Sequence, residues 1–196
     1  MDVIESKLTL IIILLITTNQ PTNPAIFTVL ESSSLKKVSY YLEVTQFVQS
    51  LIEEYSAEEG WEVVLTGHSL GGGLAIISGA QTSTRTVAFS GPNANLSRHQ
   101  FDPVLELEAL DEFVFNVIPD RDPIPMTDDP GRLRQYIECT ASVTDVAGCH
   151  SIDRSMCELL YKCGADGRPI PCTCIQKFGY DAPLDGSADS CPGLED

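Results

Sequence analysis

One serine, Ser69, lies among several glycines in the stretch LTGHSLGGG. Glycine at this density indicates a backbone that turns where a side chain would clash. The residues Gly67-His68-Ser69-Leu70-Gly71 match the pattern G-x-S-x-G, in which a serine hydroxyl projects from a sharp turn between a strand and a helix. We predict that Ser69 is a nucleophile on this turn and that the backbone N–H of Leu70 is an oxyanion-hole donor. In the alternative interpretation the serine only caps the following helix.

A nucleophilic serine requires a histidine base, and the base needs a carboxylate to fix its tautomer. The sequence contains three histidines. His68 lies inside the tight turn and is expected to point away from the Ser69 hydroxyl, whereas His99 lies in a charged stretch typical of a surface. By elimination we predict that His150 is the base. The alternative is that His150 is a surface residue at the start of a helix.

Candidates for the carboxylate follow a predicted strand in the stretch NVIPDRDPIPM, which contains Asp120 and Asp122. Catalytic groups of open parallel sheets gather beyond the carboxyl ends of the strands. Two prolines restrict the backbone around Asp122, and such stiffness suits a residue that orients another. Asp128 and Asp129 lie further from the strand end. The alternative is a polar, proline-rich turn in which these aspartates are only solvated.

Hydrophobic patterning predicts the elements that would position these residues. The expected elements are a helix at 38–55, a strand at 61–66, a helix at 74–81, a strand at 84–92, a short helix within 98–111, a strand at 112–120 and a helix at 151–163. Strands that alternate with helices are typical of a parallel sheet covered by helices. The sequence therefore predicts the α/β class.

Composition restricts the partners. The chain has 196 residues, 43% of them hydrophobic, which fits one globular domain with a sizeable core. Its formal net charge of -16 argues against a nucleic-acid partner, because phosphate binding needs clustered Lys and Arg. The same charge predicts repulsion from anionic membrane surfaces.

Cysteines occur only in the last third of the chain, at positions 139, 149, 157, 163, 172, 174 and 191. This distribution indicates a disulfide-stapled segment in an oxidising compartment. An odd count leaves at least one thiol free, paired with another chain, or without a partner from sequence that is absent here. Zinc is the weaker alternative, since Cys172-x-Cys174 lacks a second well-spaced pair, and no metal is expected.

Two further features bear on localisation. The apolar run from Leu8 to Thr18 is too short to span a membrane and has the length of a signal peptide, but acidic residues precede it. A buried strand is the equal alternative. Asn95-Leu96-Ser97 is a glycosylation sequon, which agrees with secretion.

The residues quoted above resemble those of a known family. VVLTGHSLGGGLA is similar to the nucleophile elbow of the class 3, fungal-type triacylglycerol lipases, and VAFSGPNAN to the next strand and loop. NVIPDRDPIP resembles the acid loop, with the catalytic aspartate at Asp122, and GCHSID resembles the histidine segment, with the base at His150. The order Ser69, Asp122, His150 is that of α/β-hydrolases. The resemblance extends over about 40–161.

The resemblance implies an α/β-hydrolase fold and the hydrolysis of acylglycerol or other lipid esters through an acyl-enzyme. It implies no metal or organic cofactor, and a lipid–water interface as the site of action. We expect three regions: 1–34 as a signal peptide or divergent strand region, 35–165 as the lipase-like core, and 166–196 as a Cys-, Pro- and Gly-rich tail. The tail lies outside the family pattern.

The chain also departs from the family before the elbow. Family members carry a longer front with several strands, a lid helix and an arginine-glycine motif that supplies a second oxyanion donor, and no such motif is found before Val38. The strand at 61–66 is therefore expected to have one unpaired edge. Three interpretations follow: an active esterase or lipase, a non-catalytic lipase-like binding protein, or an incomplete part of a longer lipase.

Overall fold

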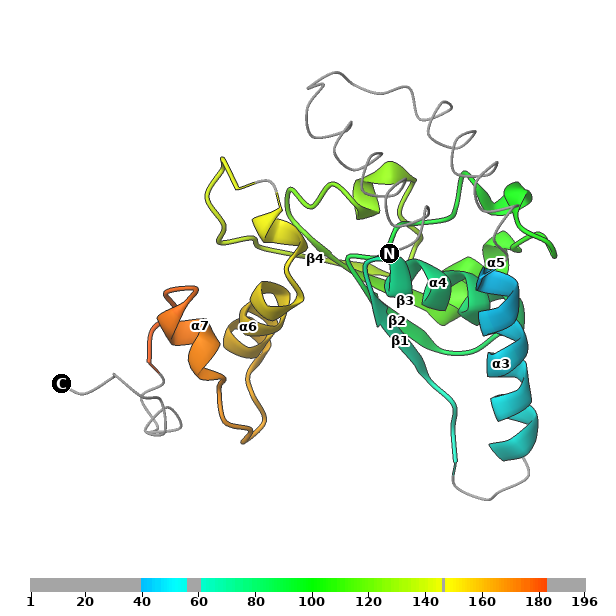
Figure 1. Ribbon diagram of the computed structural model, residues 1–196, viewed down its shortest axis with the longest axis horizontal. Coiled ribbons are helices and arrows are strands. Elements are labelled where there is room, and N and C mark those ends of the chain that lie inside the picture. Colours follow the sequence, from blue (N-terminus) through cyan, green and yellow to red (C-terminus); the bar gives the residue numbers. More distant parts are fainter. Residues whose placement is uncertain (1–39, 56–60, 146, 183–196) are drawn as a thin grey trace. The chain divides into compact units, whose positions relative to one another are not determined.

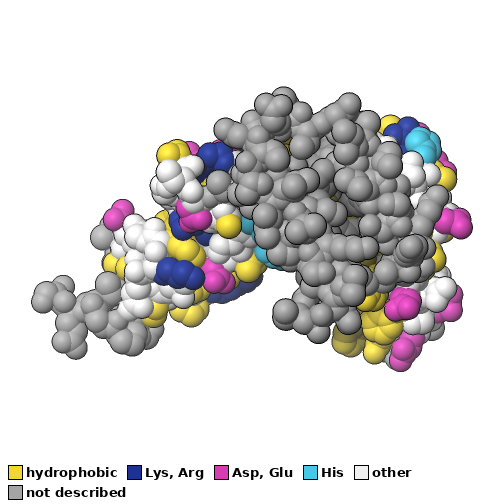
Figure 2. Space-filling view, turned by 45° about the horizontal axis from the view of Figure 1, so that its top comes forward, with side chains coloured by type: hydrophobic (Ala, Val, Ile, Leu, Met, Phe, Trp, Pro, Cys, Tyr) yellow, Lys and Arg dark blue, Asp and Glu magenta, His cyan; other side chains and the backbone are white. Residues whose placement is uncertain are grey.

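The computed structural model describes residues 40–55, 61–145 and 147–182. The apolar run at 8–18 and Cys191 lie outside these ranges. On the described part of the surface in Figure 2, acidic side chains occur at several separate places and basic ones form no broad patch.

A four-stranded parallel sheet forms the centre of the described chain (Figure 1). Its order is β1-β2-β3-β4, and every neighbouring pair is parallel. The strands are β1 (Leu65–His68), β2 (Thr86–Phe89), β3 (Val114–Pro119) and β4 (Arg134–Ile137). Because parallel neighbours run in one direction, their carboxyl ends meet at one edge of the sheet. The predicted α/β class is confirmed, and the core is that of an α/β-hydrolase-like sheet.

Helices connect the strands and cover the sheet. α4 (Leu70–Thr82) follows β1 directly and packs against β1 and β2, while α3 (Tyr40–Tyr55) packs against α4. Thr45 on α3 bonds to α4 through Ser78 Oγ at 3.0 Å and Gln81 Oε1 at 2.9 Å. α5 (Leu107–Phe113) leads into β3. None of the described helices is long and apolar enough to cross a bilayer.

The core lies between these helices and the sheet. In the parallel register, Gly67 of β1 stands opposite Ala88 of β2, and Ala88 stands opposite Asn116 of β3. Ala88 is fully buried, as expected of a central strand covered by helices. Ile76 on α4 and Ile118 on β3 are each about 2% exposed. Burial of these apolar side chains fixes the helices on the sheet and, with them, the loops at its carboxyl edge.

Three local expectations need correction. The first strand begins at Leu65 instead of Trp61. The predicted apolar face of the first helix included Phe47, which is 63% exposed, whereas Tyr41 and Val48 are the buried side chains of α3. β4 was not expected, because three of its four residues are exposed and give no alternating pattern.

The last third of the described chain is built around two helices and several disulfide-bonded cysteines. α6 (Ile152–Cys163) was expected, and α7 (Cys172–Gln176) was not. Cys139 bonds to Cys149, and Cys157 on α6 bonds to Cys174 on α7. Cys172 is also disulfide-bonded, and Cys163 is a free, exposed thiol. The predicted disulfide chemistry of this segment is therefore confirmed.

Candidate active site

Ser69 occupies the sharp turn between β1 and α4. Its backbone angles are φ 56° and ψ -125°, a conformation that non-glycine residues rarely adopt. A Cβ at Gly67 would overlap the carbonyl of Gly71, so the turn depends on the first glycine of the motif. Ser69 stands at the N-cap position of α4, but its side chain makes no capping hydrogen bond. The interpretation of Ser69 as a helix cap is therefore wrong.

The three predicted side chains form one hydrogen-bonded row. His150 Nε2 lies 2.7 Å from Ser69 Oγ. On the other side of the ring, His150 Nδ1 lies 3.1 Å and 3.0 Å from the two carboxylate oxygens of Asp122. A carboxylate can only accept, so Nδ1 carries the proton and Nε2 is free to accept the proton of the serine hydroxyl. The arrangement can move a proton from a serine oxygen to an imidazole.

The structure distinguishes among the four aspartates considered. Asp122 is fully buried, and its Oδ1 also accepts the N–H of Ile124 at 3.0 Å. Asp120 is exposed at the end of β3. Asp128 accepts the N–H groups of Leu96 and Ser97, at 2.7 Å and 3.0 Å, and thereby fastens a neighbouring loop. Only Asp122 among these aspartates contacts His150.

His150 lies on a short connection between a disulfide and a helix. The 3₁₀ turn η3 (Gly148–His150) follows a loop that the Cys139–Cys149 bridge closes, and α6 begins two residues later. Cys149 is about 1% exposed, so the bridge anchors the turn inside the protein. The predicted anchoring of this loop by Cys149 agrees with this placement.

His68 contacts the candidate base directly, which sequence reasoning missed. Its Nε2–H donates to the backbone carbonyl of His150 at 2.8 Å, and the two ring centroids lie 4.8 Å apart. Burial lowers the pKa of His68 from its usual 6.5, and the charge of His150 lowers it further. The bond to the His150 carbonyl and the charge of Asp122 oppose this shift. The neutral imidazole of His68 is therefore favoured.

Leu70 begins α4, where backbone N–H groups lack intrahelical acceptors. The helix dipole adds partial positive charge at this end. These groups suit a developing oxyanion next to Ser69. The Leu70 side chain is 47% exposed.

Two buried asparagines hold the loop that carries Asp122, and sequence reasoning missed them too. Asn93 Nδ2 donates to the Pro125 carbonyl at 2.6 Å. Asn116 Nδ2 donates to Asn93 Oδ1 and to the Gly91 carbonyl, each at 2.9 Å. Asn93 belongs to the quoted stretch VAFSGPNAN, and its position after a strand was the available signal.

The remaining candidates lie away from this row. His99 is exposed on the 3₁₀ turn η1 (Arg98–Gln100). Asn95 is half-buried, and Ser97 of the sequon donates its hydroxyl to Asp128 at 2.7 Å. Glycosylation of Asn95 stays a prediction. Within the described ranges, no group of three or more His, Cys, Asp or Glu side chains could hold a metal ion.

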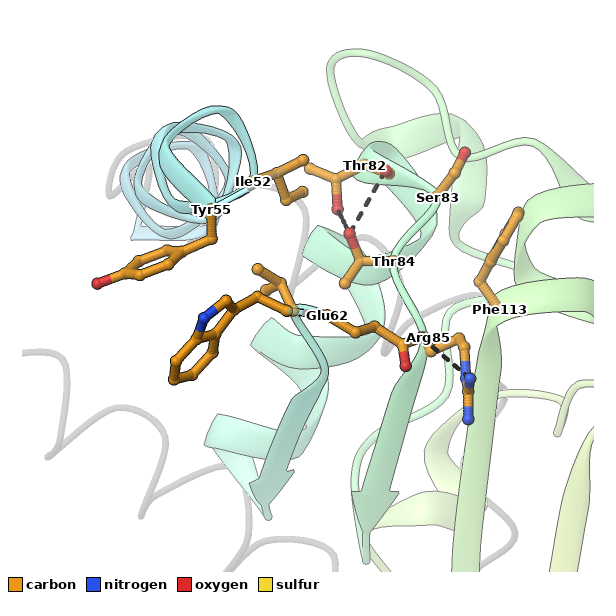
Figure 3. Close-up of a pocket in the computed structure, with 10 residues that line it drawn as sticks. Ile52, Tyr55, Glu62, Thr82, Ser83, Thr84, Arg85 and Phe113 are labelled. Carbon is orange, nitrogen blue, oxygen red and sulfur yellow. Dashed lines mark hydrogen bonds and ion pairs between the residues drawn. The ribbon is translucent and has the colours of Figure 1, made fainter. Parts of the chain in front are cut away.

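A cavity of about 350 Å³ lies near the amino ends of β1 and β2 (Figure 3). Tyr55 and Trp61 line it, as does the ion pair between Glu62 and Arg85, whose atoms are 2.9 Å apart. Neither Ser69 nor His150 lines this cavity. Catalytic groups of parallel sheets gather at the opposite, carboxyl edge. We therefore place the candidate site at the hydrogen-bonded row and not at this cavity.

Comparisons with known proteins agree with the fold. The family model described as "Lipase (class 3)" matches residues 17–129, which include Ser69 and Asp122 and end before His150. A protein of Vanderwaltozyma polyspora named "Putative lipase ATG15" is 32% identical over 131 residues, or 63% of this chain. Those residues are 21% of that protein, so the chain spans about a fifth of its length. No solved structure matches the chain. Since the family model matches more than half of its residues, the chain belongs to the class 3 lipase family.

Proposed function

We propose that the protein hydrolyses carboxylic esters of lipids, with Ser69 as nucleophile, His150 as base and Asp122 as the group that orients the base. The observation that carries this proposal is the contact of 2.7 Å between Ser69 Oγ and His150 Nε2, continued by the bonds from Nδ1 to Asp122. Membership of a lipase family supports a lipid ester, with acylglycerols as the expected class.

In the first step, Ser69 Oγ attacks the ester carbonyl carbon and passes its proton to His150 Nε2. The carbonyl oxygen becomes an oxyanion, which the Leu70 N–H stabilises at the start of α4. The C–O bond to the alcohol then breaks, and the alcohol takes the proton from His150. The product of this step is an acyl-enzyme on Ser69.

In the second step, water gives a proton to His150 Nε2 as its oxygen attacks the acyl carbon. The bond to Ser69 breaks, the serine recovers the proton and the carboxylic acid leaves. Asp122 keeps the Nδ1 proton in place throughout and stabilises the imidazolium. These steps use the side chains of Ser69, His150 and Asp122 and the Leu70 N–H, together with substrate and water.

The apolar surroundings favour an acyl chain over a polar substrate. Leu70 adjoins the nucleophile and Ile152 lies two residues beyond the base, and their side chains are 47% and 40% exposed. When an acyl chain covers these exposed apolar side chains, apolar surface is removed from water and the free energy of the bound state is lowered. The disulfides fit an oxidising compartment, and secretion is part of the proposal.

Covalent labelling with a fluorophosphonate tests the proposal. We expect the purified protein to be labelled and Ser69→Ala to be unlabelled. Ser83→Ala is a matched control, because Ser83 is another serine at positive φ, at the other end of α4, and its side chain is exposed whereas that of Ser69 is half-buried. Its label should equal that of the wild type.

The base and the orienting carboxylate are tested in the same assay. His150→Gln and Asp122→Asn should each lower the labelling rate constant by about 10³-fold or more, because the serine proton then has no well-placed acceptor. Absence of label on the folded wild type would contradict the proposal that the protein is a serine hydrolase. It would favour a lipase-like binding protein or an incomplete part of a longer lipase.

A further inference from the structure

His150 lies on a short segment outside the sheet, which β1 contacts through the bond from His68 Nε2–H to the His150 carbonyl. Its backbone N–H bonds to the Ala147 carbonyl at 3.0 Å, within the turn that follows the loop 139–149. On the other side, α6 begins at Ile152. Apart from the bonds to His68 and Asp122, the position of the imidazole therefore depends on how this loop and α6 are held relative to each other.

Arg154, on the first turn of α6, joins the two arms of that loop. Its Nε–H donates to the Gly148 carbonyl at 3.2 Å, and an Nη1–H donates to Thr140 Oγ1 at 2.8 Å. Gly148 precedes Cys149, and Thr140 follows Cys139. The rigid guanidinium fork thus fixes both arms beside their disulfide, relative to the helix that follows the base.

The guanidinium also lies over an aromatic ring of the cysteine-rich tail. Arg154 Cζ lies 4.4 Å from the centroid of the Phe178 ring, a cation–π contact. Phe178 follows α7, which the bridge between Cys157 and Cys174 fastens to α6. Both sulfur-bearing side chains are fully buried, so this attachment is firm.

Tyr180 makes a second attachment of the tail to α6. Its hydroxyl donates to Glu158 Oε2 at 2.7 Å, and its ring stacks on Tyr161 with centroids 4.5 Å apart. Burial and the bond to Glu158 raise the pKa of Tyr180 to about 12, so the hydroxyl keeps its proton. Thr140, already held by Arg154, is another hydrogen-bond neighbour of Tyr180.

We propose that the tail segment 172–182 is a brace that keeps His150 in register with Ser69, and that Arg154 is the positioning residue through which the brace acts. This inference rests on the proposed function of the same site. Neither Phe178 nor Tyr180 bonds to a member of the catalytic row, so the effect is on geometry. A displacement of about 1 Å in a reacting group can lower a rate by about 100-fold.

The test compares two substitutions at the same aromatic ring. Arg154→Met removes the cation and both bonds to the loop, whereas Lys177→Met removes the other cation of the Phe178 ring, 5.2 Å from its centroid. We expect the fluorophosphonate rate constant to fall about tenfold in Arg154→Met and to stay unchanged in Lys177→Met. Phe178→Leu should lower it several-fold, because the guanidinium then loses its support.

Two readouts separate positioning from loss of fold. With a soluble ester, Arg154→Met should lower kcat and leave KM unchanged, because a displaced base weakens only the transition state. Unfolding would instead lower the final amount of label. A wild-type rate constant in Arg154→Met would overturn the proposal, and an effect of Arg154→Met without any effect of Phe178→Leu would overturn the role of the tail.

A measurement that does not need activity keeps the brace testable if the wild type is not labelled. The proton that His150 Nδ1 shares with Asp122 should give a sharp downfield resonance by NMR in the wild type and in Lys177→Met. We expect it to broaden or vanish in Arg154→Met. An unlabelled wild type would contradict the proposed hydrolysis, whereas a sharp resonance in Arg154→Met would contradict the brace.

Discussion

At the scale of single residues, the site combines strain with a short polar contact. The backbone of Ser69 is in a region that costs non-glycine residues about 1–3 kcal/mol. The serine gains no capping bond in exchange, and its hydroxyl instead faces His150 Nε2. The packing of β1 and α4 against the rest of the sheet must hold this conformation. The hydroxyl is thus fixed before a substrate arrives.

His68 gives the site a pH dependence of stability. Because burial lowers its pKa in the folded state, the neutral ring contributes stability that is fully present above pH 6.5 and lost as the pH falls through the lowered value. Asp122 and His150 are the titratable groups next to this ring. His68→Gln keeps an amide donor near the His150 carbonyl but does not titrate.

Urea unfolding of the two proteins between pH 5 and 8 measures this contribution. The difference in unfolding free energy, wild type minus His68→Gln, should decrease as the pH falls below 6.5. All other titrating groups are shared, so their contributions cancel to first order. A difference that stays constant over this range would contradict the lowered pKa of His68.

At the scale of elements, the turn from β1 into α4 requires its glycines unequally. An added Cβ at Gly67 would overlap the Gly71 carbonyl, whereas at Gly71 it would meet nothing within 4 Å. We expect Gly67→Ala to lower the free energy of unfolding by about 2 kcal/mol, because the first turn of α4 must shift. Gly71→Ala should raise it by about 0.5–1 kcal/mol, because alanine favours a helix.

Chemical denaturation of both variants checks these opposite signs. Each protein carries the same added methyl group, four residues apart, so each is the control for the other. Equal destabilisation would show that the turn has no specific need for Gly67. Loss of label in Gly67→Ala, with the fold retained, would separate the geometry of the nucleophile from stability.

The sequence predicted the elements around the nucleophile better than those near the base. β2 and the later part of α4 are mostly apolar or β-branched, a pattern that is set by residues close together in the chain, whereas β1 begins four residues after its expected start. β4 and α7 have no such pattern, since β4 is mostly exposed and α7 has five residues. Pairing with β3 and a disulfide to α6 stabilise them, and both interactions come from distant parts of the chain.

At the scale of the molecule, a fully buried disulfide links the tail to the rest of the fold. The bridge between Cys157 and Cys174 closes a loop of 17 residues, for which chain entropy predicts a contribution of about 3 kcal/mol. The double substitution of both residues by alanine should lower the free energy of unfolding by about this amount. Cys163→Ala, at the free and exposed thiol, should leave it unchanged.

Guanidinium unfolding under non-reducing conditions measures both variants. A cooperative transition in the wild type is part of the expectation, because the described sheet and helices share one core. If the double variant unfolded like the wild type, the bridge would carry no stability. If the double variant kept the main unfolding transition and lost only the structure of the tail, α7 would be a separate unit of folding.

The sequence alone predicted the sharp turn at Ser69 and a parallel sheet covered by helices, and it left both Asp120 and Asp122 as candidates for the carboxylate. These features depend on local chemistry, since a turn, a buried strand and an amphipathic helix each follow from residues close together in the chain. The tertiary structure decided that Asp122 and not Asp120 contacts the base, that His68 holds its carbonyl, and which cysteines pair. Each of these contacts joins residues far apart in the sequence, and only the packed backbone brings their atoms within bonding distance.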